Sequence, residues 1–195
     1  MSKQIIITGN IGSGKSAVTD IFRMKGYFVI SADVVSAKIL EENHRTVSKM
    51  FSMPPQKFTT FKKTLSNLVF QRPEYLKELE DFMLPLIKQE IDYQCDALIS
   101  SDRKFVVEMP TYFKNNPEGI PGDTVIIVNA DKDIRVHRVL KRNSHLSIQD
   151  VLDRIRNQPD LRGYRQEKFA WTIDNNTSLE YLQGQVDEFI WTLEN

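Results

Sequence analysis

The residues from Gly9 to Ser16 constrain the fold of this chain more than any other stretch, because they read Gly-Asn-Ile-Gly-Ser-Gly-Lys-Ser. Three branched apolar residues, Ile5-Ile6-Ile7, precede this motif and indicate a buried strand, and a helical pattern follows it. A glycine-rich turn between a strand and a helix is the usual setting of a phosphate-binding loop. The motif in these surroundings therefore predicts that the chain binds a nucleoside triphosphate.

Each part of the motif has an expected role. We expect Lys15 to reach the β- and γ-phosphates of ATP and the Ser16 hydroxyl to bind Mg²⁺. Glycine lets the backbone approach the phosphates closely, and the N–H groups of the loop and of the next helix attract their oxygens. A glycine-rich turn with an ordinary lysine is the alternative, which the full spacing disfavours. The predicted nucleotide-binding residues of this segment are Gly9, Asn10, Ile11, Gly12, Ser13, Gly14, Lys15, Ser16 and Ala17.

The composition excludes several classes of protein. The 195 residues include 26 basic and 26 acidic side chains, so no overall field favours nucleic acid or an anionic membrane as a partner. The single cysteine, Cys95, excludes an internal disulfide and a zinc–cysteine cluster. No apolar run approaches the roughly 18 residues of a membrane span, and a strand begins close to Met1. We therefore expect a cytoplasmic protein without a targeting segment, as a monomer or weak homo-oligomer.

A second predicted strand, residues 27–31, ends just before Asp33. In open α/β sheets, ligands collect at the carboxyl ends of the strands, which is where the phosphate loop also lies. Asp33 is therefore a candidate catalytic base. The alternative is that Asp33 caps the helix that Val34, Val35 and Ile39 indicate, since a carboxylate accepts backbone N–H bonds there.

The remaining segments predict one α/β domain. Residues 43–61 are polar and irregular around Pro54-Pro55, and helical spacing resumes at Leu65 and again from Pro73. Further strands are predicted at residues 105–110, 124–128 and 171–173, the first containing Glu108, and Thr177 with Glu180 is expected to cap a last helix. Strands that alternate with helices indicate a parallel sheet. We predict a P-loop NTPase-type three-layer α/β/α fold with a five-stranded parallel sheet. Its expected parts are a nucleotide-binding core (about residues 1–33, 104–134 and 169–195), a helical acceptor-binding insertion (about 34–103) and a helical lid (about 135–168).

The expected lid is rich in basic side chains. Such a run is usually a solvated face, but a kinase lid must also bring arginines to the transferring phosphoryl group. We expect two or three of these residues to be functional. Ser147 with Asp150 predicts a capped helix within the lid. The basic residues are Arg135, Arg138, Lys141, Arg142, Arg154, Arg156, Arg162, Arg165 and Lys168.

Taken in order, these segments resemble the dephospho-coenzyme A kinase family. Val29-Ile30-Ser31-Ala32-Asp33 is similar to the family's V-I-D-A-D, and Glu108 in Val107-Glu108-Met109-Pro110 stands for the Asp of D-V-P. The resemblance continues through Leu68-Val69-Phe70 and Pro85-Leu86-Ile87 (L-V-F and P-L-I), Arg138 with Arg142 (R-L-x-x-R), Arg154-Ile155 with Gln158 (R-I-x-x-Q), and Ile173-Asp174-Asn175 (V-I-D-N).

The resemblance implies transfer of the γ-phosphoryl group of MgATP to the ribose 3′-hydroxyl of dephospho-coenzyme A. It implies that Asp33 is the base and that Lys15, Arg138 and Arg142 stabilise the transferring group, with Arg142 also at the nucleotide. Asn175 would line the adenine site. Glu108 would hold a water of the magnesium shell, or a lysine, unless it is simply a carboxylate at a strand end.

The sequence departs from the family pattern mostly on the acceptor side. The departures are Phe61-Lys62 for Asp-Arg, Leu84 for His before Pro85, Lys114 for an acid, and Phe169-Ala170 for Ala-Asp. Two alternatives therefore stay open. One is a kinase for a nucleotide or deoxynucleoside monophosphate, because Asn10 before the second loop glycine is similar to deoxynucleoside kinases. The other is an ATP-binding regulator with weak catalysis.

Overall fold

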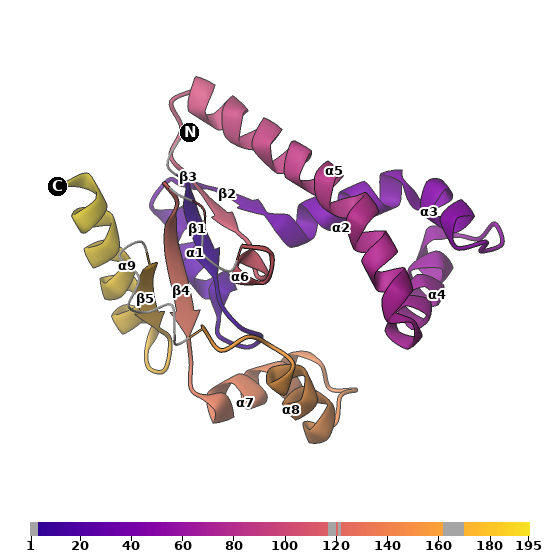
Figure 1. Ribbon diagram of the computed structural model, residues 1–195. Helices are drawn as coiled ribbons and strands as arrows, with labels where there is room; N and C mark the ends of the chain where they lie inside the picture. Colours follow the sequence, from indigo (N-terminus) through magenta and orange to yellow (C-terminus); the bar gives the residue numbers. More distant parts are fainter. Residues whose placement is uncertain (1–3, 117–119, 121, 162–169) are drawn as a thin grey trace. The chain divides into compact units, whose positions relative to one another are not determined.

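The computed structural model describes residues 4–116, 120, 122–161 and 170–195. The chain divides into two compact units, one of Met1–Ile30 with Asp102–Asn195 and one of Ser31–Ser101. The first unit is built on a sheet, and the second consists almost entirely of helices (Figure 1). None of the helices in the described part of the chain combines the length and apolar composition that a membrane crossing needs.

A five-stranded sheet forms the centre of the first unit, with the strand order β2-β3-β1-β4-β5. β1 pairs in parallel with β3 and β4, and β4 pairs in parallel with β5. All four residues of β1 are buried, as expected for a central parallel strand with both faces covered. The predicted α/β class with a parallel five-stranded sheet is confirmed. The strands are β1 (Ile5–Thr8), β2 (Phe28–Ser31), β3 (Phe105–Glu108), β4 (Thr124–Asn129) and β5 (Ala170–Asp174).

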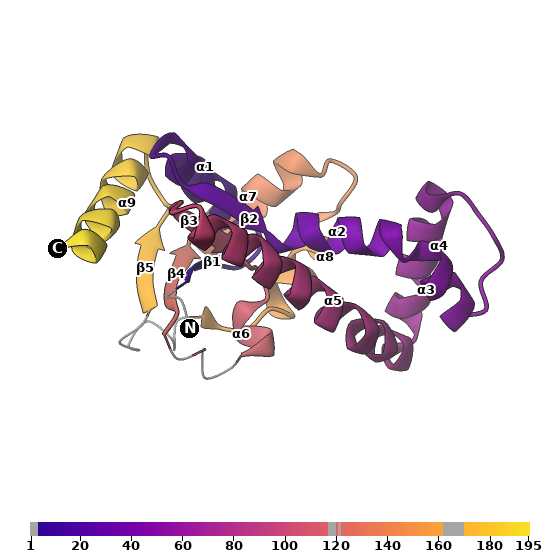
Figure 2. The same cartoon turned by 90° about the horizontal axis from the view of Figure 1, so that it is seen from above.

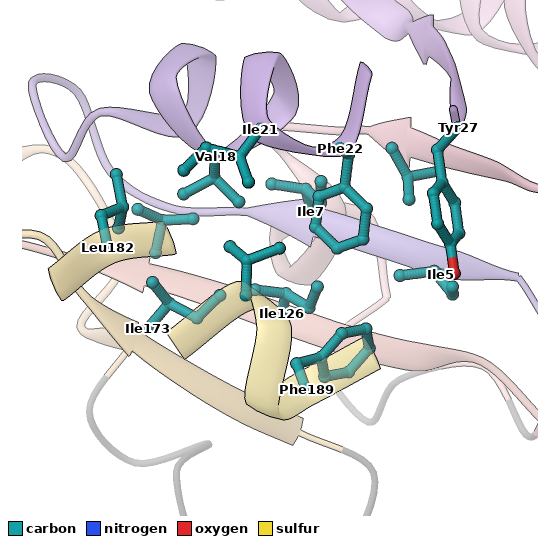
Figure 3. Packing of buried hydrophobic residues seen from close by; sticks show 13 residues of the cluster. Ile5, Ile7, Val18, Ile21, Phe22, Tyr27, Ile126, Ile173, Leu182 and Phe189 are labelled. Carbon is teal, nitrogen blue, oxygen red and sulfur yellow. The ribbon is translucent and has the colours of Figure 1, made fainter. Parts of the chain in front are cut away.

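The main core lies between the sheet and two helices, α1 (Lys15–Met24) and α9 (Leu179–Glu194). These two helices run side by side along the sheet (Figure 2). Val18, Ile21 and Phe22 repeat at i, i+3 and i+4 on α1, so all three point into the core, as Figure 3 shows. The core fixes the start of α1 relative to the end of β1, and hence the two ends of the phosphate loop.

The described part of the first unit also contains the helices α6 (Tyr112–Asn115), α7 (Lys132–Arg142) and α8 (Ile148–Arg156). The predicted capping box of α8 is confirmed, because the Ser147 hydroxyl accepts from Asp150 N and the Asp150 side chain accepts from Ser147 N. The predicted cap of the last helix is wrong by one residue. Ser178, not Thr177, caps α9 by accepting from Tyr181 N at 3.2 Å. Both hydroxyl residues lie at the helix start, so composition alone does not select between them.

The second unit contains α2 (Ala32–Glu42), α3 (His44–Met50), α4 (Phe58–Gln71) and the 28-residue α5 (Pro73–Ser100). The prediction of an irregular segment at residues 43–61 is confirmed only for residues 51–57 around Pro54-Pro55, and it is wrong on either side, where α3 and the start of α4 lie. α3 has seven residues and buries only Val47, which is too little to display a helical period. Val47 packs with Phe61 and Leu65 of α4 in a separate small core.

Replacing Phe22 with alanine tests the main core. Phe22 is fully buried and makes edge-to-face contacts with Tyr27 and Phe189. We expect F22A to lower the free energy of unfolding by about 3–5 kcal/mol through lost apolar burial and the cavity that remains. Chemical denaturation measures this difference. Met24 on the same helix is 66% exposed, so M24A should change stability by less than about 0.5 kcal/mol. Equal effects of the two variants would contradict the assignment of the core.

Candidate functional site

The glycine-rich loop has the predicted position between β1 and α1, which begins at Lys15. Gly12 and Gly14 have φ angles of +77° and +92°, in the left-handed region that favours glycine. A Cβ atom on Gly12 would lie 2.6 Å from the Arg135 carbonyl oxygen, and one on Gly14 would lie 2.0 Å from Asn175 Nδ2. The loop therefore needs glycine both for its backbone angles and for the close approach of its neighbours.

The start of α1 is arranged to receive an anion. No side chain caps it, and its first turn contains no acidic residue, so its N–H groups and its positive end are available to phosphate oxygens. Lys15 lies back along the loop, where Nζ donates to Gly9 O at 2.8 Å and to Asn10 O at 3.4 Å. Ser16 follows in the first turn with an exposed side chain. These groups match the chemistry of a phosphate chain with a bound Mg²⁺.

A cavity of about 340 Å³ adjoins the loop on the side of β4 and α8. Ser13 lines this cavity and is 1% exposed, yet its hydroxyl has no hydrogen-bond partner in the described part of the chain. A buried hydroxyl without a partner is costly, so it indicates that a polar ligand or an ordered water completes the site. Other lining residues include the amides Asn10, Asn129 and Gln158 and the cations Lys132 and Arg135.

Arg138 and Asn175 come from distant parts of the sequence and meet at the loop. Arg138 Nη1 donates to Ser13 O at 3.3 Å and to Gly12 O at 3.5 Å, and Nη2 donates to Asn175 O at 3.0 Å and Asn175 Oδ1 at 3.2 Å. The Asn175 amide in turn donates to Ser13 O at 2.9 Å. The structure thus unites two of the predicted site residues with the loop, through its carbonyl oxygens.

The other predicted side chains lie at separate positions. Arg142 is exposed in the last turn of α7 and is outside this group of hydrogen bonds. Glu108 ends β3 and stands in register with Ile7 on β1, two residues before the loop begins. Asp33 belongs to the second unit, where it is exposed in the first turn of α2. Ser31 occupies the N-cap position of α2, so the alternative that Asp33 is the cap is wrong.

Sequence analysis did not assign a role to Arg135 or Gln158, yet both contact the loop at Ile11. Burial lowers the pKa of the Arg135 guanidinium, which still stays charged at neutral pH. Two signals pointed toward these residues: Arg135 begins the basic run, and Gln158 falls in the R-I-x-x-Q segment. Three other members of the basic run, Arg162, Arg165 and Lys168, lie outside the described residues.

No group of three or more histidine, cysteine or acidic side chains that could hold a metal occurs among the described residues. The predicted magnesium-binding groups are instead the Ser16 hydroxyl in the first turn of α1 and the Glu108 carboxylate at the end of β3. This set fits Mg²⁺, which usually keeps several waters and binds through substrate phosphates and one or two protein groups.

The positions that depart from the family pattern have different environments. Phe61 is fully buried in the small core of the second unit, whereas Lys62 is exposed with its ammonium 5.7 Å from the centre of the Phe58 ring. Leu84 on α5 is 40% exposed and Lys114 on α6 is exposed, while Ala170 begins β5. Phe61 therefore has a structural role, and Lys62 and Leu84 are accessible to a ligand.

Comparison with known proteins gives a consistent result. The family model for dephospho-CoA kinase matches residues 4–180. The dephospho-CoA kinase of Helicobacter pylori is 30% identical over 195 residues, covering 99% of this chain and 98% of that protein. Among solved structures, TT1252 from Thermus thermophilus superimposes with a TM-score of 0.83 at 31% identity, over 99% of both chains. Dephospho-CoA kinase from Campylobacter jejuni gives a TM-score of 0.71 at 25% identity, over 99% of this chain and 98% of that one.

Replacing Gly14 with alanine tests the loop. The new methyl group would meet the buried Asn175 amide and force a left-handed backbone angle on alanine. We expect G14A to weaken ADP binding by at least about tenfold, since the N–H groups that face the phosphates must shift. Isothermal titration calorimetry measures the change. Gly26 has a similar φ of +86° but no atom within 4 Å, so G26A should lower stability and leave ADP affinity unchanged. Normal binding by G14A would contradict the site.

Proposed function

Since this chain belongs to the dephospho-CoA kinase family, we propose that it transfers the γ-phosphoryl group of ATP to the ribose 3′-hydroxyl of dephospho-coenzyme A. The observation that carries this proposal is a family match that spans residues 4–180, and therefore both units, together with a phosphate loop in its complete setting. The activity class is a phosphotransferase that acts on an alcohol group. The proposed setting is the cytoplasm, with the enzyme as a monomer or weak homo-oligomer.

The donor half of the reaction uses the loop. The N–H groups of residues 12–16 would surround the phosphates, and Lys15 would exchange its bonds to the Gly9 and Asn10 carbonyls for phosphate oxygens. Its ammonium then stabilises the charge on the transferring group. Asn175 would line the adenine site, and its amide already fixes the loop at Ser13 O.

The transfer also needs a base and a lid. We assign Asp33 as the base that accepts the proton of the acceptor hydroxyl. Its support is its exposed position in the first turn of α2, directly after β2, and the absence of a hydrogen bond or ion pair to its carboxylate among the described residues. We assign the segment of about residues 135–168 as a lid that closes over the transferring phosphoryl group. Arg142 is exposed and lies at the end of α7, where it is suited to approach the transferring phosphoryl group. Arg138 lies on the same helix and would act beside the loop that it contacts.

Mg²⁺, when bound with ATP, neutralises charge on the β- and γ-phosphates and orients them. The Ser16 hydroxyl would hold the ion, and Glu108 would hold a water of its shell. Glu108 has the register for this task, because it stands beside Ile7 at the end of a strand next to β1. Its side chain is only partly buried, so it can reach water.

A phosphotransfer assay over several acceptors tests the function. Purified protein with MgATP would be offered dephospho-coenzyme A, a panel of nucleosides and a panel of nucleoside monophosphates, and the products would be separated by chromatography. We expect coenzyme A to form. Transfer only to a monophosphate or nucleoside would contradict the acceptor and support the alternative kinase. No transfer to any acceptor, with ATP still bound, would support the regulator.

The D33N variant tests the base. Asparagine keeps the size of the side chain but cannot accept the proton, so we expect kcat to fall by about 10²–10⁴ while the dissociation constant for ATP stays nearly unchanged. Steady-state kinetics and calorimetry measure the two quantities. Glu41 is an exposed carboxylate on the same helix, and E41Q should match the wild type. Unchanged turnover of D33N would remove Asp33 from this role.

A further inference from the structure

We propose that Arg135 and Gln158 form a brace that holds the outer turn of the phosphate loop in its nucleotide-binding shape. Both are positioning residues, because they act through the backbone of Ile11 and not on the nucleotide itself. The proposal rests on the nucleotide-binding half of the proposed function and is independent of the acceptor. We define the brace as the three hydrogen bonds that join Arg135, Gln158 and Ile11.

The brace is a closed set of hydrogen bonds. Ile11 N donates to Gln158 Oε1 at 2.9 Å, and Arg135 Nε donates to Ile11 O at 2.9 Å. Arg135 Nη2 completes the set by donating to Gln158 Oε1 at 3.1 Å. Both polar backbone groups of one loop residue are thus held by two side chains that also bind each other. A side chain that merely filled surface space would not satisfy both groups.

Ile11 lies within a hydrogen-bonded turn of the loop. Ser13 N donates to Asn10 O at 3.1 Å, so residues 10–13 form a turn with Ile11 at its second position. The Asn10 amide adds another bond on the same side by donating to Pro159 O at 3.1 Å. The tight approach of Gly12 to the Arg135 backbone shows that the turn packs directly against α7. Three consecutive carbonyl groups of the loop are therefore hydrogen-bonded to side chains from outside it. Arg135 of the brace binds that of residue 11, and Arg138 binds those of residues 12 and 13.

The charge of Arg135 adds a second effect. Its partners in the described part of the chain are two neutral oxygens, and no acidic side chain there forms an ion pair with it. The half-buried guanidinium therefore keeps a net positive charge beside the loop, where it raises the potential felt by phosphate. Bonds from a charged donor are also stronger than neutral ones, which favours a rigid turn.

Substitutions can separate the hydrogen bonds that Gln158 accepts from the space that its side chain fills. In the hydrogen bonds among the described residues, the Gln158 side chain accepts from two donors and donates none, so glutamate keeps both bonds and leucine removes them. The new carboxylate in Q158E would also offset the positive charge of Arg135, so this variant keeps the hydrogen bonds but loses the charge effect, for which we expect a loss of affinity of less than about threefold. Gln149 on α8 offers a matched control, because it is exposed and its side-chain hydrogen bond within the described part of the chain is a local one to Asp153 at 2.9 Å.

Calorimetric titration of the full chain with ADP tests the brace without any phosphoryl transfer. We expect Q158L to raise the dissociation constant of ADP about tenfold, Q158E to stay within about threefold of the wild type, and Q149L to match it. R135M should weaken binding at least as much as Q158L. The double variant R135M/Q158L should be close to R135M alone, because removing one member breaks the shared set. In kinetics, Q158L should raise the KM for ATP more than it lowers kcat, since the loop binds the phosphates before and during transfer.

Several results would overturn the brace: normal ADP affinity in Q158L, equal loss in Q158E and Q158L, or additive losses in the double variant. Thermal unfolding of each variant separates a loosened loop from a misfolded chain, and the Q158 pair decides the matter alone if R135M fails to fold. Wild-type protein that does not bind ADP would contradict the proposed function itself. Wild-type binding with an unaffected Q158L contradicts only the brace.

Discussion

The constraint on which the rest of this structure depends is that the phosphate loop does not provide hydrogen-bond donors for the carbonyl groups of Ile11, Gly12 and Ser13. Lys15 and Ser13 satisfy the carbonyl groups of Gly9 and Asn10 from within the loop, but the next three carbonyl groups must find donors elsewhere in the protein. Arg135 donates a hydrogen bond to Ile11 O, and Arg138 donates to Gly12 O and Ser13 O. Asn175 also donates to Ser13 O. Three side chains from outside the loop thus bind its carbonyl groups, and Gln158 adds a bond to the N–H group of Ile11.

The sheet order explains why those donors come from the later part of the chain. β4 and β5 follow β1 on one side of the sheet, and the segments after them emerge at the same edge as the loop. The helix α7 follows β4 and brings Arg135 and Arg138, while the turn after β5 brings Asn175. Residues more than a hundred positions apart thus meet because their strands are neighbours. On the other side, β3 brings Glu108 to the end of β1.

The predictability of each part follows from the range of the forces that determine it. β1, the loop and α1 were predictable because branched apolar residues, glycine spacing and a helical period act over a dozen neighbouring residues. The capping box of α8 is equally local. The helix α3 was not predictable, because its stability comes from Val47 packing on α4 and not from its own pattern. Phe61 shows the same limit: its sequence position suggested a changed substrate contact, and its burial shows a core residue. The hydrogen bonds of the brace could not be predicted from local patterns, because Gln158 lies 147 positions from Ile11 in the sequence.

Because the loop depends on donors from outside it, the motif cannot simply be transferred to another protein. The eight residues from Gly9 to Ser16 suffice to recognise the site in a sequence, but they do not carry its shape with them. Transplanted onto another strand and helix, the octapeptide would leave three consecutive carbonyl groups without their guanidinium and amide donors, and its tight turn would relax. The unit that can be inherited or engineered as a working module is therefore the loop together with Arg135, Arg138, Gln158 and Asn175, although these residues are scattered over most of the chain.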